Sequence, residues 1–382
     1  MSTRTLLFTD CVDFVGAACK AFAGMKKYVS TGAVDVDHIN DSETEIVDYD
    51  GKPSRANLEV MVGDVLFAKM QGTKKTLLID PVLAKHIYST GFCAVRAKKA
   101  ILTERCLYHI LMSEMFLSQK DKNCSGATQK AITNAGLGKI VIHVPSVEEQ
   151  NNIADQLDAV IGIITKRQQE LSALDNLIKA RFVEMFGDPR TNPNGYEVEE
   201  LRSSCTVVTG NTPPRLVEEY YGDGIEWIKT DNIVSGRISP TQAVERLSEK
   251  GMKVGRIVDE DAILMACIAG SIASIGRVCI TDRKVAFNQQ INAVIPKHYD
   301  VRFLYVLLQL SKDYLVEEIN MALKGILSKS KLEDKVFYVP PMELQEQFAT
   351  FFSQVDKSKV VVQKALDEAQ VLFDSLMQQY FG

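Results

Sequence analysis

The segment Pro145-Ser146-Val147-Glu148-Glu149-Gln150 opens a long apolar-periodic run that closes at Met185-Phe186-Gly187, and the chain contains this design twice. The second copy opens with Pro340-Pro341-Met342-Glu343-Leu344-Gln345 and closes at Tyr380-Phe381-Gly382. Gln150 and Gln345 are 195 residues apart, and so are Gly187 and Gly382. About forty residues therefore align without a gap, which indicates that the chain is an internal duplication.

Both copies have the period of a long helix. Apolar residues recur in alternating steps of four and three along 148–187 and 342–382, which is the heptad pattern of helices that pair. Proline before each run and glycine after it are common start and stop signals. At about 1.5 Å per residue, each helix would be a rod of roughly 60 Å. The residues that we expect to form the pairing seam are Ile153, Leu157, Val160, Ile164, Leu171, Leu174, Ile178, Phe348, Phe352, Val355, Val362, Leu366, Phe373 and Leu376.

A heptad stripe also occurs in helices of an ordinary core and in dimerisation zippers, which have the same period. Two internal copies of one length favour a spacer, in which each helix is the partner of the other.

The segments that precede the helices, 1–147 and 188–341, have the pattern of mixed α/β domains. In the first, a buried strand after a turn is expected within 60–68, with further strands at 76–79, 92–96 and 140–144 and a helix over 100–117. The stretch 10–23 is compatible with a helix or a strand.

The second segment repeats this order. Gly16 aligns with Gly210, and Asp64-Val65-Leu66 aligns with Asp261-Ala262-Ile263. Residues 188–195, which contain two prolines and two asparagines, form the expected linker between the halves. The sequence thus predicts an α+β protein with two tandem mixed α/β domains, each followed by a long helix. The expected boundaries are 1–147, 148–187, 188–341 and 342–382.

Composition agrees with such a protein. A length of 382 residues suggests two or more domains, and a hydrophobic content of 46% with 24% charged residues is typical of soluble globular proteins. No run of eighteen apolar residues or signal peptide is evident, so we expect a cytoplasmic protein without a membrane span. The eight cysteines include no CxxC pair, so we expect them to be reduced and buried and expect no metal site.

The net charge of −5 argues against a protein that is basic over its whole surface. The two helical segments together carry 7 basic and 13 acidic side chains, while residues 1–147 carry 18 basic and 15 acidic ones. Any contact with nucleic acid must therefore come from local clusters of lysine and arginine.

The sequence contains no recognisable catalytic constellation. We find no phosphate-binding Gly-rich loop, no HExxH pair and no GxSxG elbow. Thr212-Pro213-Pro214-Arg215 only superficially resembles the Asn-Pro-Pro-aromatic motif of amino-methyltransferases. We therefore predict no catalytic residues and no cofactor bound by this chain.

Matched loops in the two domains carry the strongest functional signal. Basic and amide side chains there supply hydrogen bonds to phosphates and base edges, and the glycines let the backbone approach closely. A solvated turn accounts for any single loop, but the matched positions in both halves favour a common role. The predicted DNA-binding residues are Lys69, Gln71, Thr73, Lys74, Lys75, Gln129, Lys130, Arg215, Lys229, Asn232, Ser271, Ser274, Arg277, Asn288, Gln289, Gln290 and Lys329.

With these residues in view, the whole chain resembles the DNA-specificity subunit of type I restriction–modification systems. The resemblance rests on five stretches and on the Val-Pro-x-x-Glu-x-Gln openings of both helices. One departure is the entry of the first domain, 11–24, which lacks the Gly-x-Thr-Pro turn of the second. The stretches are Gly63-Asp64-Val65-Leu66-Phe67-Ala68, Gly126-Ala127-Thr128-Gln129-Lys130, Gly210-Asn211-Thr212-Pro213-Pro214, Trp227-Ile228-Lys229-Thr230-Asp231-Asn232-Ile233 and Ala286-Phe287-Asn288-Gln289-Gln290-Ile291-Asn292.

The resemblance implies that each domain is a target-recognition domain for one half of a split sequence in double-stranded DNA. The helices would pair as an antiparallel coiled coil and fix the spacer length. Two modification subunits would dock on the helices, bring S-adenosylmethionine and methylate adenine, and a separate restriction subunit would cleave.

In this scheme Lys74, Lys75, Arg215 and Lys329 would contact phosphates, while Gln71, Ser271, Asn288 and Gln289 would contact bases. The isolated chain would be able to self-associate through its unpartnered apolar helix faces. The main alternative is a non-catalytic coiled-coil adaptor that joins proteins without reading DNA.

Overall fold

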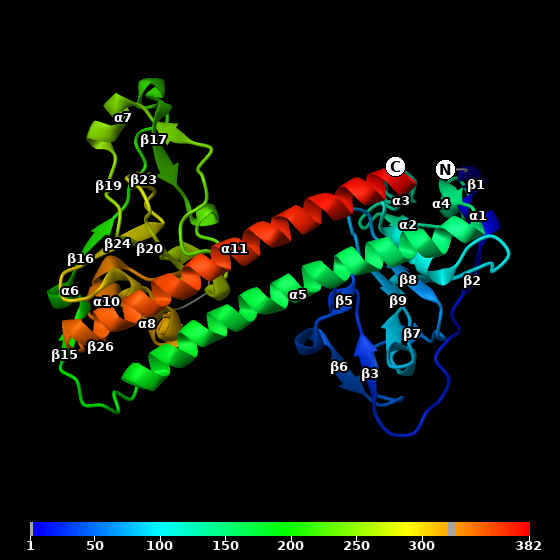
Figure 1. Cartoon of the computed structure of the whole chain (residues 1–382), viewed down its shortest axis with the longest axis horizontal. Helices are drawn as coiled ribbons and strands as arrows, with labels where there is room; N and C mark the ends of the chain where they lie inside the picture. Colours follow the sequence, from blue (N-terminus) through cyan, green and yellow to red (C-terminus); the bar gives the residue numbers. More distant parts are fainter. Residues whose placement is uncertain (1–2, 320–324) are drawn as a thin grey trace. The chain divides into compact units, whose positions relative to one another are not determined.

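The computed structural model describes residues 3–319 and 325–382 (Figure 1). The chain forms two compact units, one made of residues 1–168 together with 364–382 and the other of residues 169–363. Helices α5 (Val147–Phe186) and α11 (Met342–Phe381) have 40 residues each, and each contributes one end to each unit. The two predicted helices are therefore confirmed, with ends that differ from the prediction by at most one residue.

Unit 1 is built on two four-stranded sheets. The inner sheet, which packs on the helices, has antiparallel neighbours throughout, and in the outer sheet β3 and β10 are parallel. The inner sheet has the order β2 (Val12–Val15), β11 (Phe92–Ala97), β8 (Val65–Ala68), β9 (Thr76–Leu78), and the outer sheet has the order β6 (Glu45–Val47), β3 (Lys26–Val29), β10 (Ile87–Ser89), β7 (Ala56–Leu58).

Short elements complete unit 1. The paired strands are β1 (Thr3–Leu7) with β14 (Val141–Pro145), β4 (Val34–Asp35) with β5 (His38–Ile39), and β12 (Cys124–Ser125) with β13 (Ala131–Ile132). The helices are α1 (Phe8–Cys11), α2 (Glu104–Met112), α3 (Glu114–Lys122) and α4 (Asn134–Leu137). The ambiguous stretch 10–23 thus contains the end of α1 and then β2.

Unit 2 repeats both sheets. Its inner sheet has the order β16 (Cys205–Thr209), β24 (Ile291–Pro296), β20 (Ile263–Ala266), β22 (Val278–Ile280), and its outer sheet has the order β18 (Arg246–Leu247), β17 (Tyr221–Ile228), β23 (Val285–Phe287), β19 (Ile257–Val258). The short strand pairs are β15 (Val198–Glu200) with β26 (Val336–Tyr338) and β21 (Ile268–Ala269) with β25 (Gly325–Ile326). The helices are α6 (Leu201–Ser204), α7 (Glu249–Val254), α8 (Val301–Leu310), α9 (Lys312–Val316) and α10 (Lys329–Glu333).

Strand pairing corrects the sequence alignment of the two inner sheets by one residue. Leu66 pairs with Ala94 in unit 1, and Leu264 pairs with Ala293 in unit 2, so Leu66 corresponds to Leu264 rather than to Ile263. Gly63 and Asp261 then become equivalent, and both have positive φ, 88° and 60°. The alignment of Asp64 with Asp261 is therefore wrong by one residue. The difference matters because a shift of one residue in a strand moves each side chain to the opposite face of the sheet.

The predicted helix over 100–117 is also corrected, because Ser113 divides it into α2 and α3. The Ser113 backbone is extended, at φ −71° and ψ 147°, and its Oγ accepts a hydrogen bond of 3.2 Å from the Phe116 amide. Serine favours this capping role over a place inside a helix. Ser311 separates α8 from α9 at the equivalent position of unit 2.

The ends of the long helices form part of each core. In unit 1, the start of α5 packs beside the end of α11, and in unit 2 the end of α5 packs beside the start of α11, so the helices are antiparallel. The seam residues that are buried are Ile153, Leu157, Val160, Ile178, Phe348, Phe352, Val355, Val362 and Phe373, and those that are half-buried are Ile164, Leu171, Leu174, Leu366 and Leu376.

One buried glutamine fixes the start of each long helix. Gln150 accepts a hydrogen bond of 2.8 Å from the Thr103 amide and donates to the carbonyls of Ile101 and Pro145. Gln345 does the same in unit 2, accepting 2.9 Å from the Asp300 amide and donating to the carbonyls of His298 and Pro340. Both side chains are fully buried, so the repeated Gln satisfies three backbone groups that water cannot reach.

In the described ranges no helix is long and apolar enough to cross a membrane. All eight cysteines are unbridged, as predicted, although Cys93 and Cys124 are only half-buried.

Candidate functional site

In unit 1, two of the predicted loops meet. The loop 69–75 joins β8 to β9, and its Gln71 amide donates to the Lys130 carbonyl at 3.0 Å. The Ile132 amide likewise donates to the Lys69 carbonyl at 2.9 Å. The side chains of Gln71, Gln129 and Lys130 are exposed there, so cationic and amide groups from two separate segments share one surface.

A buried lysine that the sequence analysis missed holds this surface in shape. Lys120 in α3 is only 1% exposed, and its Nζ donates to the carbonyls of Met70 at 3.0 Å and Thr73 at 2.7 Å. The neighbouring Asp121 accepts a 3.0 Å hydrogen bond from the Gly72 amide. The loop is therefore preorganised, since its backbone is tied to a helix on both sides of Gly72. A lysine in a mixed helix gives no sequence signal of burial.

Two predicted lysines take other positions. Lys75 donates from Nζ to the Thr31 carbonyl at 2.8 Å, so its charge is used within the unit. Lys74 lines a cleft of about 490 Å³ beside the end of α11, together with Gln370 and Asp374. Lys69 and Thr73 are half-buried, and the Thr73 hydroxyl donates to the Met70 carbonyl at 2.6 Å.

Unit 2 has an equivalent loop after β20. The Ser271 and Ser274 hydroxyls lie 3.0 Å apart, and the Arg277 Nε donates to the Ser274 carbonyl at 3.3 Å. Lys312 in α9 donates to the Ala273 carbonyl at 2.6 Å, which repeats the role of Lys120 in unit 1. Both units thus stabilise this loop with a lysine from the helix that follows the dividing serine.

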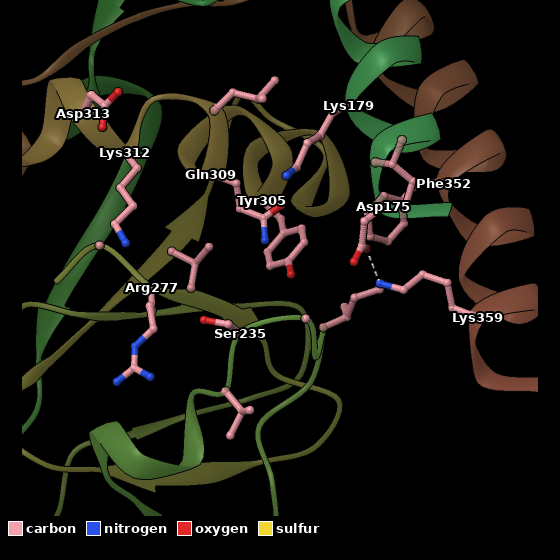
Figure 2. A pocket seen from close by; sticks show the side chains of 17 residues that line it. Asp175, Lys179, Ser235, Arg277, Tyr305, Gln309, Lys312, Asp313, Phe352 and Lys359 are labelled. Carbon is pink, nitrogen blue, oxygen red and sulfur yellow. Dashed lines mark hydrogen bonds and ion pairs between the residues drawn. The ribbon is translucent and has the colours of Figure 1, made fainter. Parts of the chain in front are cut away.

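A cavity of about 420 Å³ lies beside this loop and is lined by α5, α11, α8 and the segment 234–238. Figure 2 shows the side chains that line it. Its wall carries Lys179, Arg277 and Lys312 as well as the Lys359–Asp175 ion pair at 2.5 Å. The Lys359 side chain is buried at a seam position, and Asp175 neutralises it there. Asp313 lines the same cavity, so the three remaining cations share it with a second carboxylate.

A second group of predicted residues lies on the outer sheet of unit 2. The Arg215 guanidinium lies 4.9 Å from the ring centres of both Tyr221 and Trp227, and its Nη1 donates to Glu245 at 2.7 Å. Lys229 lies 5.2 Å from the Trp227 ring centre and also contacts Glu245. The hydrogen bond from Lys229, with Arg215 assisting and burial opposing, lowers the pKa of the Glu245 carboxyl, so this carboxylate stays ionised.

The predicted amides differ in what they present to solvent. Asn288 is 5% exposed, and its side chain bonds to the Gln290 amide at 3.0 Å and to the Gln290 side chain at 3.2 Å. Asn232 caps the Lys229 amide at 3.0 Å and donates to Thr241 at 3.1 Å. Gln289 is exposed, and its side-chain oxygen accepts a hydrogen bond from Thr212, so its NH₂ group can donate to a ligand.

The predicted residues of unit 2 therefore form two groups, one around Ser271 and Arg277 and one around Arg215, Lys229 and Gln289. Lys329, at the start of α10, forms an ion pair of 3.5 Å with Glu333. Arginine, lysine and glutamine at exposed loop positions suit hydrogen bonds to phosphates and base edges.

Comparison with known proteins gives one family. The model of the type I restriction modification DNA specificity domain matches residues 16–173 and again residues 193–369. The specificity subunit of the type I restriction enzyme HindI from Haemophilus influenzae is 22% identical over 342 residues, which cover 69% of this chain and 73% of that protein. The MjaIX specificity subunit from Methanocaldococcus jannaschii is 24% identical over 323 residues, covering 77% and 72%.

Solved structures share the fold. The S subunit of a type I restriction–modification system from M. genitalium superposes with a TM-score of 0.60 at 14% identity, covering 100% of this chain and 96% of that one. A chain from a study of assembly and conformational transition of the type I R-M system gives a TM-score of 0.52 at 20% identity, covering 99% and 97%.

Proposed function

The chain belongs to the family of type I restriction modification DNA specificity domains, and from this premise we propose that each unit reads one half of a split DNA target. The observation that carries the proposal is the repetition of one loop arrangement in both units. In each, a loop after the inner-sheet strand is tied to a helix by a lysine, Lys120 or Lys312, and exposes polar side chains.

We assign the contacts by exposure. Gln71, Gln129 and Gln289 are exposed amides that reach base edges, and Lys130 and Arg215 contact phosphates and orient the duplex. Asn288 supports the turn beside Gln289, because its own amide is buried and bonded.

The long helices are the docking surface for partner subunits in this proposal. Their exposed faces carry several apolar side chains, which would be covered by a protein partner. We propose two modification subunits, which bring S-adenosylmethionine, and a restriction subunit in the complete complex, with no catalysis by this chain. We place the protein in the cytoplasm, because the DNA that it would read and the S-adenosylmethionine that its partners would use are found in that compartment. The exposed apolar residues are Ile163, Leu177, Val183, Val360, Val361, Val371 and Leu372.

Methylome sequencing of the source organism with and without the gene tests the proposal. We expect methyladenine to disappear from one bipartite motif on deletion and to return when the gene is restored. If all methylated motifs persist in a strain that expresses the system, the DNA-reading role is wrong and the role of a protein-joining adaptor is favoured.

A second measurement assigns the units. Replacement of Gln71 should relax the motif in one half only, and replacement of Gln289 should relax it in the other half only. Replacement of the exposed Lys130 should instead weaken all sequences alike, because a phosphate contact carries no base information.

A further inference from the structure

Two side chains in loops beside the outer sheet of unit 2 are almost fully exposed. Leu216 is 98% exposed and Val244 is 99% exposed. Each is the chain neighbour of one partner in the Arg215–Glu245 ion pair, so the ion pair brings the two loop segments that carry them together. Single exposed apolar residues are common on protein surfaces, but two on adjoining segments that one ion pair joins suggest a binding role.

The backbone that carries these side chains is held firmly. The Trp227 Nε1 donates to the Asn211 carbonyl at 3.3 Å, and the Tyr221 hydroxyl donates to the Pro213 carbonyl at 2.6 Å. The Trp227 amide donates to the Glu245 carbonyl at 3.0 Å. Both segments are thus fastened to β17, and the exposure of Leu216 and Val244 belongs to an ordered surface rather than to a loose loop.

Glu245 adds a chemical requirement. A carboxylate near DNA is repelled by the phosphates, so it is tolerated there only with neutralising cations and a hydrogen-bond donor to accept from. Arg215 and Lys229 supply the cations. Among base edges in the major groove, the exocyclic amino groups of cytosine and adenine are the donors, and the thymine methyl is the apolar group.

We propose that Leu216, Val244 and Glu245 form a base-reading tip of unit 2, in which the carboxylate accepts from an exocyclic amino group and the apolar side chains cover a thymine methyl. This assignment rests on the proposed DNA-reading function. It adds three specificity residues to those proposed around Ser271 and at Gln289.

Double-stranded DNA fits this surface better than a protein does. Arg215 is half exposed despite its ion pair, and the nearby Arg256 has an exposed side chain while its amide bonds to Asn211 at 2.7 Å. The Gln289 side chain is held near this segment by its bond with Thr212. Two apolar side chains among cations and amides offer far less apolar area than a stable protein interface buries.

The test uses the full-length chain assembled with its modification subunits and a randomised pool of DNA targets, with methylation of each target as the readout. We expect Glu245→Gln to change the preferred base at one position of one half-site. Leu216→Ala and Val244→Ala should relax a neighbouring thymine, each by about tenfold in discrimination. Melting temperatures should stay at the wild-type value for the last two, because nothing packs on these side chains.

Matched controls are available in the same unit. Val198→Ala alters another exposed valine, on β15, and Glu260→Gln alters an exposed carboxylate; both should leave the motif unchanged. The assignment is overturned if all three tip variants keep the wild-type motif, or if they lower methylation of every target equally. If the wild-type complex itself shows no bipartite motif, the proposed DNA-reading function fails as well.

Discussion

At the scale of single residues, Gln150 and Gln345 lead to the clearest prediction. Gln150→Ala and Gln345→Ala should each lower the free energy of unfolding by about 2–4 kcal/mol, because each leaves three buried backbone groups without partners and opens a cavity. Thermal or urea unfolding measures this loss.

Matched controls lie within two residues of each glutamine. Asn152→Ala and Gln347→Ala remove exposed polar side chains from the second turns of the same helices and should change stability by less than about 0.5 kcal/mol. Equal effects of the buried and exposed substitutions would contradict the role assigned to the glutamines.

Residues that occur at matching positions of both halves could be predicted to matter. Residues whose role depends on burial of the side chain could not. Repetition singled out Gln150 and Gln345, and the structure gives both the same bonds. Burial separates Asn288 from Gln289, although the two are adjacent in one polar run. The exposure of Leu216 and Val244 has no sequence signal, since both lie in loops, where burial follows no periodic pattern.

At the scale of elements, the end of α5 departs from its heptad. Phe182 and Phe186, neither of which belongs to the predicted seam, are fully buried against Phe303 and Phe348 in unit 2. Heptad reasoning missed them because the helix end there packs on a whole domain core rather than on one partner helix, which widens its apolar stripe.

Phe182→Ala should therefore destabilise unit 2 by about 3–5 kcal/mol, since it removes a fully buried aromatic ring. The neighbouring Val183 is 45% exposed, and Val183→Ala should cost under about 1 kcal/mol. Similar losses for both variants in chemical denaturation would contradict the packing described.

A polar contact ties α2 to α5 in unit 1 and makes stability depend on pH. His109 is fully buried, with its Nε2 2.6 Å from Asp158, and Arg105 bonds to Asp158 and Asp155. Burial raises the pKa of the Asp158 carboxyl, but the hydrogen bonds from His109 and Arg105 together hold that pKa below its usual value.

A carboxyl with a lowered folded-state pKa contributes stability above its unfolded pKa of about 3.9, and this stability is lost as the pH falls through the folded pKa. Asp158→Asn should thus lower the melting temperature at about pH 6 and differ progressively less from wild type below about pH 4. Exposed Asp155→Asn is the control, with a smaller effect expected. A difference for Asp158→Asn that is constant with pH would contradict this account.

The long helices and the strands β8, β9, β11 and β14 could be predicted from the sequence, while the outer-sheet strands β3, β6, β7 and β10 and two boundaries could not. The helices and the strands β8, β9, β11 and β14 follow period and turn residues. The break at Ser113 depends on a cap hydrogen bond, and the register of β20 depends on strand partners far along the chain. Neither is encoded in a local pattern.

At the scale of the whole molecule, α5 and α11 each pass from one unit to the other without interruption. Duplicating one heptad in both helices keeps their seam and adds about 10 Å of helix. We expect the target of the assembled complex to gain about three base pairs of spacer, given about 3.4 Å per base pair.

Methylation of a pool with variable spacers measures this change. Duplication of the heptad in only one helix should abolish methylation, because the two helices then differ in length by about 10 Å although each keeps its heptad phase. An unchanged spacer after the double duplication would show that the helices do not determine it.

The internal duplication could be predicted from the sequence, but which residues make up each unit could not. Residues 364–382 belong to unit 1 although they follow all of unit 2 in the chain. Contacts between segments so far apart in the chain produce no periodic pattern in the sequence. The predicted boundary at 147 therefore marks where the first long helix begins and not where unit 1 ends.

The sharing of helix ends has a consequence for protein synthesis. Phe373, Met377, Tyr380 and Phe381 belong to the core of unit 1. A ribosome that has already made the first 168 residues must therefore translate all of unit 2 before that core can close. The first unit made is the last to be completed, so its apolar surface stays exposed to chaperones and proteases until residue 381 has left the exit tunnel.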